Sequence, residues 1–451
     1  MLNRRPLEVM PRERAPRSGE ARSCSQFTLC ILHFALCILI LAFAGCVHPP
    51  ESAVAPPAAP PSEAEQPPAF PPPQPTPPMP PAPPALPPAL PAIIVPPKLD
   101  RPPMLRVWLS DVSAAPEISC AGPCRVKVIP GDQEKRHAKL MAANAFLVPG
   151  GIRLGDAMYK CSSLEIEAEP GGQVRVAGRG YSGTIRLLRS TDRVTVIVVL
   201  DVERYLLNVV GGEMPADWPA EALKAQAVAA RTLAIFDHLQ RAAFEYDLTS
   251  TVEDQVYAAG KVKPSIAEAV ADTTGVVLLH EGGLFPAFYH STCGGETETP
   301  GEALGKPEYN FLEGVPCGFC TDSSHYQWRA TLSAAELESK LRAAGFTVGA
   351  ITAVSVEGSD SRAERLVKLV WAGGRTLIPI VDFRRAVGQM VIQSGKFECR
   401  AEGGDFRFTG RGFGHGAGMC QYGARGMARA GRLYREILMH YYRNCAIGKL
   451  Y

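Results

Sequence analysis

The sequence predicts an α+β fold, in which a β-rich N-terminal part packs with an α+β core behind a disordered, proline-rich stalk. Three observations support this prediction. Of the 41 prolines, 25 fall within residues 49–103. Short β-branched runs follow over residues 104–200, and a long Ala-rich helical segment begins near Pro219. The length of 451 residues allows two or three domains, and the net charge of +2 gives no electrostatic reason to expect a nucleic-acid partner.

Residues 1–46 have the pattern of an export segment. Six arginines lie within residues 1–26, and the 18 residues 27–44 are almost entirely apolar. The sequence LAFAGC, which ends at Cys46, resembles the lipobox of bacterial lipoproteins, although Phe43 stands where an aliphatic residue is usual. An uncleaved membrane anchor is the alternative, because about 18 apolar residues nearly span a bilayer. Either interpretation places the remaining chain outside the cytoplasm, attached to a membrane by lipid or anchor.

Residues 47–103 are too rich in proline to form a hydrophobic core. Runs such as PPPQPTPPMPPAPPALPPALP favour extended polyproline II, which rises about 3.1 Å per residue. About 50 such residues reach on the order of 150 Å when fully extended. We therefore predict a disordered stalk rather than a ligand for proline-recognising domains.

Residues 104–200 are predicted to form the β-rich part. Six short, partly alternating runs of β-branched residues lie between Gly, Pro, Ser and Asp turns. The runs are LRVWLS, CRVKVIP, LEIEAE, GQVRVAG, GTIRLLRS and RVTVIVVLD. The end of the last run marks the predicted start of the second, catalytic part, residues 201–451.

The second part contains the stretch GGEMPADWPAEALKAQAVAAR. Asp217 or Trp218 can cap a helix that has Pro219 in its first turn, and Ala, Leu, Lys and Gln sustain this helix to about His238. We therefore predict a long helix directly after the EMP sequence.

Glu213 lies ahead of this helix in a predicted loop. Lys224 and Arg231 share one face of the helix, because helical residues at spacings of three or four lie above one another. Loop and helix together would offer one acid and two cations to a single site. The alternative is that Glu213 is an ordinary turn residue and that both cations are solvated.

Two later stretches concentrate His, Cys and Tyr among glycines, where the main chain can turn tightly and approach a ligand closely. They are FYHSTCGGETE (288–298) and GRGFGHGAGMCQYGARGMA (410–428). In the second, glycines alternate from Gly410 to Gly418, which leaves Arg411, Phe413 and His415 on the opposite face. Such a face suits a flat polar polymer such as a glycan. The alternative is a buried glycine-rich turn in which His415 is already hydrogen-bonded.

Three motifs thus occur in order: EMP at Glu213 with WPAEALKAQAVAART, then HSTCGGETE, then GRGFGHGAGMCQYGARGMA. Over roughly residues 105–445 this pattern resembles the stage II sporulation protein D family, also called the amidase-enhancer or LytB-type family. The resemblance implies a lytic transglycosylase that cuts the β-1,4 bond between N-acetylmuramic acid and N-acetylglucosamine in peptidoglycan strands without stem peptides. Glu213 matches the family's catalytic glutamate. The residues expected to bind substrate are Lys224, Arg231, Arg411, His415, Gln421 and Tyr422.

One carboxylate suffices for this reaction. As general acid it protonates the glycosidic oxygen, and as base it helps the sugar's own 6-hydroxyl close onto the anomeric carbon, which leaves a 1,6-anhydro end. A hydrolase needs a second carboxylate about 5 to 10 Å away, for which Asp217, Glu253 and Asp254 are candidates. A second hypothesis is a non-catalytic peptidoglycan-binding protein that enhances a cell-wall amidase. An intact motif around Glu213 favours the enzyme.

The cysteines predict a metal site. His290 and Cys293 of HSTC, together with Cys317 and Cys320 of CGFC, make a complete tetrahedral zinc set. His325 is an alternative fourth ligand. Family members with cysteines at these positions are associated with zinc, so the resemblance also favours metal over a disulfide. A closed set leaves no position for water, so the zinc would be structural, and the chemistry itself requires no cofactor.

Nine cysteines follow Cys46, an odd number that disulfide pairing leaves unbalanced. Cys120 and Cys124 of CAGPC are close enough in sequence to close a tight turn. Cys420 stands where the family commonly has Ser, so its side chain is not expected to be essential for catalysis. The sequence does not rank the pairings of Cys161, Cys399, Cys420 and Cys445.

Overall fold

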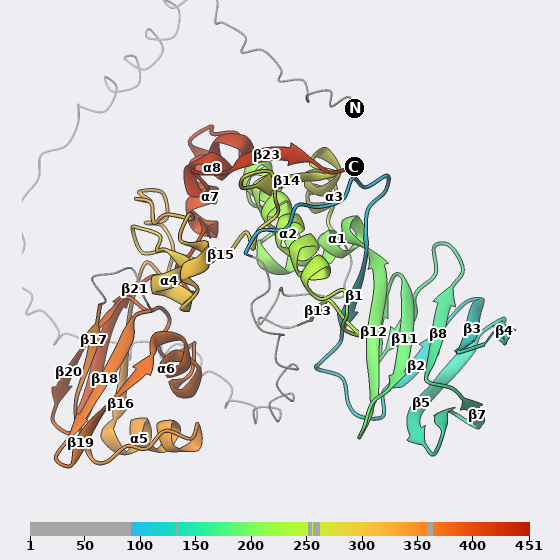
Figure 1. The fold of residues 1–451 in the computed structure, drawn as a ribbon, viewed down its shortest axis with the longest axis horizontal. Coiled ribbons are helices and arrows are strands. Elements are labelled where there is room, and N and C mark those ends of the chain that lie inside the picture. The colour runs from blue at the N-terminus through green and yellow to red at the C-terminus, as the bar shows by residue number, and fades with distance from the viewer. Residues whose placement is uncertain (1–91, 132, 251–254, 256–261, 359–363) are drawn as a thin grey trace, which may run out of the picture. The chain divides into compact units, whose positions relative to one another are not determined.

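The computed structural model describes residues 92–131, 133–250, 255, 262–358 and 364–451. The predicted export segment with Cys46, most of the predicted stalk, and Glu253 and Asp254 lie outside these residues. Within them the chain has a mixed α+β structure, as predicted (Figure 1). No helix in these ranges is long and apolar enough to cross a membrane. The chain already contacts the folded part ahead of the predicted boundary, because Ile94 pairs with Leu284.

Two sheets contain the N-terminal strands. The larger has the order β13-β1-β12-β11-β8-β3-β4 and the smaller the order β10-β9-β2-β5-β6-β7. All pairs are antiparallel except β13 with β1. The strands are β1 (Met104–Trp108), β2 (Glu117–Cys120), β3 (Cys124–Ile129), β4 (Glu134–His137), β5 (Leu140–Val148), β6 (Gly151–Leu154), β7 (Ala157–Lys160), β8 (Ser163–Ala168), β9 (Val174–Val176), β10 (Arg179–Tyr181), β11 (Thr184–Arg189), β12 (Val194–Asp201) and β13 (Leu248–Thr249).

Hydrophobic patterning explains these sheets. In β3, Cys124, Val126 and Val128 are buried while the residues between them are exposed, which is the period of a half-buried strand. The buried faces of the strands belong to the same hydrophobic core as the helices, and this core includes residues from Leu105 to Tyr442. The β-rich part therefore packs with the second part, as predicted.

Helices α1 (Val202–Glu213) and α2 (Ala220–Gln240) follow β12 directly. Asp201 caps α1, because its carboxylate accepts a hydrogen bond from the Arg204 N–H over 3.0 Å. Alanine-rich α2 is buried on most of its surface. Packed around it are α1, α3 (Pro264–Asp272), α7 (Gln421–Arg429) and α8 (Tyr434–Tyr441).

Two sequence predictions in this region are wrong. Pro219 occupies the N-cap position of α2, so neither Asp217 nor Trp218 caps that helix. Glu213 is the last residue of α1 rather than a loop residue. The β-rich run ending at Asp201 concealed α1, because a short helix after a strand leaves too few turns for a clear period.

Short elements complete this part of the fold. Strand β14 pairs antiparallel with the C-terminal β23, and β15 pairs in parallel with β22. The elements are α3 (Pro264–Asp272), β14 (Val276–Leu279), β15 (Tyr289–His290), α4 (Pro300–Leu304), the 3-10 helix η1 (Pro307–Tyr309), β22 (Met419–Cys420), α7 (Gln421–Arg429), α8 (Tyr434–Tyr441) and β23 (Ala446–Lys449).

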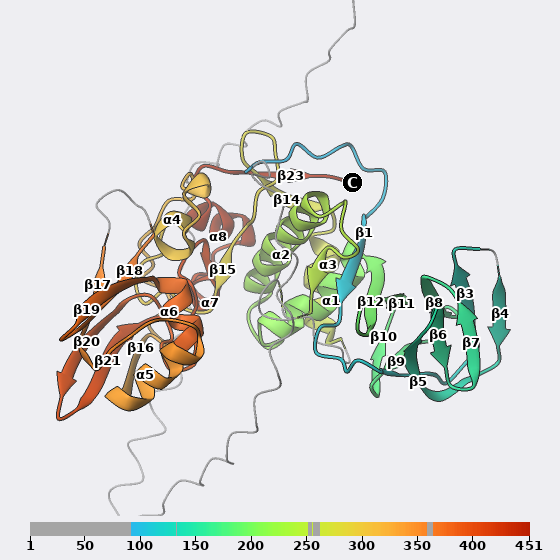
Figure 2. The same cartoon turned by 60° about the horizontal axis from the view of Figure 1, so that its bottom comes forward.

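Residues 327–411 form an inserted module with a hydrophobic core of its own, from Trp328 to Phe408 (orange in Figure 2). It has two three-stranded sheets, β16-β21-β20 and β17-β18-β19. Its elements are β16 (Gln327–Ser333), α5 (Ala334–Ala343), β17 (Ile351–Glu357), β18 (Leu366–Trp371), β19 (Gly374–Pro379), α6 (Ile380–Val387), β20 (Phe397–Glu402) and β21 (Asp405–Arg411). The sequence prediction, which treated residues 201–451 as one part, did not include this module.

Candidate functional site

Glu213 is half-buried at the C-terminal end of α1. Gln421, the first residue of α7, donates a hydrogen bond from Nε2 to Glu213 Oε2 over 3.2 Å. The same amide donates to Oε1 of Gln226 on α2 over 3.4 Å, and Gln226 is fully buried. Residues from the first and third sequence motifs therefore meet at one carboxylate.

Tyr289 from the second motif also faces Glu213. Its hydroxyl is buried near the carboxylate without a fully formed hydrogen bond. Burial raises the pKa of Tyr289 well above its ordinary value, and the negative charge of Glu213 raises it further. The phenol therefore stays protonated and is available as a neutral donor beside Glu213.

The pairing of β15 with β22 explains how distant motifs meet. Tyr289 lies opposite Met419 and His290 lies opposite Cys420 in this parallel pair. Gln421 follows β22 and begins α7, so one short pairing positions residues of the second and third motifs.

The alternating glycines have a structural reason that differs from the predicted one. Gly412, Gly414, Gly416 and Gly418 all adopt positive φ, between 68° and 111°. A Cβ at these positions would collide with atoms of residues 288–298, such as Glu298 Oε2 at 2.5 Å from position 416. The glycines thus let the third motif lie against the protein's own second motif.

Trp218, Tyr422 and Arg425 form a half-buried aromatic rim next to the Gln421 contact. The Trp218 and Tyr422 rings meet edge to face with centroids 5.0 Å apart. The Arg425 guanidinium lies 5.1 Å from the Trp218 centroid and 5.5 Å from the Tyr422 centroid. Tyr422 was predicted as a site residue, whereas Trp218 and Arg425 were not. The three-residue spacing of Tyr422 and Arg425 on one helix is the signal that points to Arg425.

The two predicted cations of α2 are already bound to protein acids. Lys224 Nζ lies 3.1 Å from Glu221 and 3.0 Å from Asp272, and Asp272 raises the pKa of this lysine most. Arg231 is fully buried and binds both oxygens of Glu203, at 2.9 and 2.7 Å. A guanidinium with no exposed surface has no access to a glycan, so the predicted substrate contact of Arg231 is corrected to a structural ion pair.

Arg411 and His415 lie at other positions of the third motif. Arg411 is exposed at the end of β21, and its carbonyl accepts a hydrogen bond from Ser394. The His415 ring packs against Phe288 and His290, with centroids 6.1 and 5.5 Å apart. Burial lowers the pKa of His415 to about 4, so its ring is neutral at pH 7. Their substrate-binding roles remain predictions.

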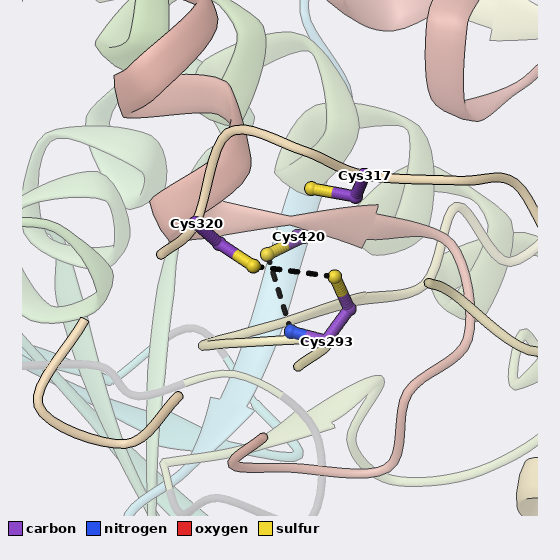
Figure 3. Close-up of side chains that lie close together, drawn as sticks. All are labelled: Cys293, Cys317, Cys320 and Cys420. Carbon is purple, nitrogen blue, oxygen red and sulfur yellow. Dashed lines mark hydrogen bonds between the residues drawn. The ribbon is translucent and has the colours of Figure 1, made fainter. Parts of the chain in front are cut away.

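Four buried cysteines form one cluster: Cys293, Cys317, Cys320 and Cys420 (Figure 3). Their Sγ atoms all lie within 4.8 Å of one another, and those of Cys293 and Cys320 are 3.5 Å apart. Hydrogen bonds with Cys293 and then with the other thiols lower the pKa of Cys320. Four sulfur ligands at this spacing suit a tetrahedral metal ion, so the donor set fits the expected metal.

The structure places the two predicted histidine ligands outside this cluster. His290 is buried, and its Nδ1–H donates to the Ala417 carbonyl over 3.0 Å. His325 Nδ1 is hydrogen-bonded to Gln393 Oε1 over 2.8 Å. Cys420 takes the fourth position of the cluster instead. It escaped sequence analysis because the inserted module separates it from the other three cysteines, although Cys in place of the usual Ser was a signal.

Cys420 connects the cluster to the candidate site. Its Sγ accepts a hydrogen bond from the Gly423 N–H over 3.3 Å and so caps α7. Gln421 is the next residue in the chain. The cluster therefore fixes the first turn of the helix that carries the amide bound to Glu213.

Known proteins resemble this chain in the same region. The family described as "Stage II sporulation protein" matches residues 190–280, which include α1, Glu213 and α2. An uncharacterized protein of Brachyspira hyodysenteriae is 30% identical over 344 residues, which cover 75% of this chain and 91% of that protein. Stage II sporulation protein D of Bacillus subtilis is 32% identical over 266 residues, covering 55% of this chain and 75% of that protein. The amidase enhancer of the same species is 27% identical over 351 residues, covering 65% of this chain and 48% of that protein. These similarities show that the chain belongs to the stage II sporulation protein D family.

Proposed function

We propose that this protein is a peptidoglycan lytic transglycosylase that cleaves β-1,4 bonds between N-acetylmuramic acid and N-acetylglucosamine and leaves 1,6-anhydro ends. The contact of Gln421 with Glu213 carries the proposal, because two motifs far apart in sequence converge on one carboxyl group. The substrate is a glycan strand from which stem peptides have been removed.

Two neutral groups near Glu213, Gln421 and Tyr289, suit a residue that changes protonation state during the reaction. Gln421 and Tyr289 can orient the carboxyl without neutralising its charge. Protonated Glu213 donates to the glycosidic oxygen as the bond to the anomeric carbon breaks. The resulting carboxylate then accepts the proton of the 6-hydroxyl as that oxygen bonds to the anomeric carbon. No water is consumed, so a second carboxylate is not required.

The family and the N-terminal sequence support a proposal for where the protein acts and with which partner. The name of one relative, amidase enhancer, supports a role at the cell wall in company with an amidase. Amidases remove stem peptides and would supply the strands that this enzyme cuts. We propose that the protein acts outside the cytoplasm, held at a membrane by a lipid on Cys46 or by an uncleaved anchor.

The cysteine cluster has a structural role in this proposal. Its four thiolates would hold a zinc ion in a closed tetrahedral set, with no ligand position left for substrate or water. The ion would stabilise the start of α7 through Cys420, and the protein side chains alone would perform the proton transfers.

Replacing Glu213 by Gln in the full-length chain tests the proposal. Release of soluble fragments from amidase-treated peptidoglycan should fall about 100-fold or more, because an amide transfers no proton. Glu268→Gln is the matched control, since Glu268 is an exposed carboxylate on α3 and should leave the rate unchanged. Equal rates for the two variants contradict the proposal. Strand binding without cleavage by wild type would favour the enhancer hypothesis.

A further inference from the structure

We infer that Arg425 selects strands without stem peptides by binding the free lactyl carboxylate of N-acetylmuramic acid. The inference rests on the proposed function, because it names the substrate feature that the same site recognises. In the intact wall this carboxyl group is joined to the peptide as an uncharged amide. Removal of the peptide leaves a carboxylate, which is a strong hydrogen-bond acceptor for a guanidinium.

Arg425 lies on the helix whose first residue contacts the proposed catalytic group. It lies four residues after Gln421 on α7, and residues at this spacing project from the same face of a helix. Gln421 is the residue that contacts Glu213. The rings of Trp218 and Tyr422 flank the guanidinium and fix its orientation.

Arg425 retains hydrogen-bonding capacity. Its side chain is 19% exposed, and Asp322 accepts a hydrogen bond from Nη1 over 3.1 Å. Its Nε–H is buried and has no hydrogen-bond partner. A guanidinium has five N–H donors, so this contact leaves donors for a second acceptor.

The local charge also favours an anion. Asp322 binds Arg429 Nη1 as well, at 2.9 Å, so one carboxylate is shared by two guanidinium groups. Asp322, Arg425 and Arg429 together carry a net charge of +1. By contrast, Lys224 lies between two carboxylates and Arg231 is fully buried. Arg425 is therefore better placed than these two predicted cations to meet a charged substrate.

The test measures binding by a variant that should not cleave the strands. Full-length protein with Glu213→Gln is titrated with denuded strands and with the same strands after their lactyl carboxyls are converted to methylamides. The two probes have nearly the same shape and differ in charge. We expect the charged strands to bind about ten-fold more tightly, which is the value of one charge-assisted hydrogen bond.

Adding Arg425→Gln should reduce the ratio of the two affinities, charged strands over methylamide strands, to about one. Arg425→Lys should keep part of this ratio because the charge remains. Arg432→Gln is the matched control and should keep the full ratio, because its guanidinium pairs with Glu436 at 3.0 Å and is not part of the charge group around Asp322. An unchanged ratio in the Arg425→Gln protein overturns the inference, as does a ratio of one before that substitution. Cleavage by the Glu213-containing protein, measured in parallel, shows whether the proposed function survives either result.

Discussion

At the residue scale, the surroundings of Glu213 determine which chemistry it can perform. The Gln421 amide donates to the carboxylate, and the buried Tyr289 phenol faces it. Neither of these two groups adds a positive charge that would hold the carboxylate in its charged form. Gln421 and Tyr289 therefore orient the carboxyl group without favouring one protonation state through a charge of their own.

Replacing Tyr289 by Phe should lower kcat about five- to ten-fold with little change in KM, because the charged carboxylate loses a nearby donor. The alkaline limb of the rate profile should also move to higher pH, since the variant stabilises the charged form less. Tyr159→Phe in the β-rich part is the matched control. If both variants have wild-type kcat and pH profiles, Tyr289 does not position Glu213.

His415 should make stability depend on pH. Its pKa is about 4 in the folded protein against 6.5 in the unfolded chain, because burial excludes the charged ring. Above pH 6.5 neither the folded nor the unfolded chain binds this proton, so the full stability of the folded protein is present. As pH falls from 6.5 towards 4, the unfolded chain takes up a proton that the folded protein excludes, so stability falls.

We expect the titration of His415 to lower the free energy of unfolding by about 1–2 kcal/mol when the pH falls from 7 to 5. Urea denaturation at both values should show a smaller pH effect for His415→Asn than for wild type. Equal pH effects in the two proteins would show that His415 titrates normally in the folded state.

The candidate site residues that can be predicted from the sequence lie inside its motifs. The resemblance to the family motifs predicts Glu213, Gln421 and Tyr422, and the structure brings Gln421 to Glu213. Tyr289 was missed because its position opposite Glu213 depends on the pairing of β15 with β22. No spacing within one segment encodes such a contact.

At the element scale, α7 couples the cysteine cluster to the candidate site. Gly426 lies where a Cβ would overlap the main-chain oxygen of Phe319, and Gly423 lies where a Cβ would overlap Tyr441 and Cys317. These glycines let α7 pack directly on the loop that carries CGFC. Its position against that loop therefore depends on the absence of two side chains.

Gly426→Ala should destabilise the protein by about 1–3 kcal/mol, because main-chain atoms of Phe319 must move to admit the methyl group. Gly211→Ala in α1 is the opposite case, since the nearest atom to its added Cβ is Ile266 Cγ1 at 3.9 Å. That substitution should stabilise by about 0.5–1 kcal/mol through helix propensity. Thermal unfolding of both variants checks this, and a stabilised Gly426→Ala protein would contradict the close packing of α7.

Metal analysis tests the revised ligand set. Cys420→Ser should lower the zinc content of the purified protein, because it removes one of four ligands, whereas His290→Asn should leave the content unchanged. Cobalt substitution gives a second measurement, since a four-thiolate site has more intense sulfur-to-metal absorption than a three-thiolate site. The reverse result, with zinc lost only from the His290 variant, would restore the ligand set predicted from sequence.

At the scale of the whole molecule, one hydrophobic core joins the sheets to the helices and a second core supports the inserted module. The sequence predicted the α+β class, many of the strands and the long helix α2, because their hydrophobic periods are local. It did not predict the module or Cys420 as a partner of Cys293. Both follow from long-range packing, in which residues 327–411 separate Cys320 from Cys420.

The most direct test of the central claim is mass spectrometry of the sugar ends that the full-length protein produces from amidase-treated peptidoglycan. Lytic transglycosylase chemistry at Glu213 predicts N-acetylmuramic ends in the 1,6-anhydro form, each lighter by one water than a hydrolysed end. These ends should be absent with Glu213→Gln. Reducing ends from the wild-type protein would contradict the account, because they require water as nucleophile and a second carboxylate to activate it.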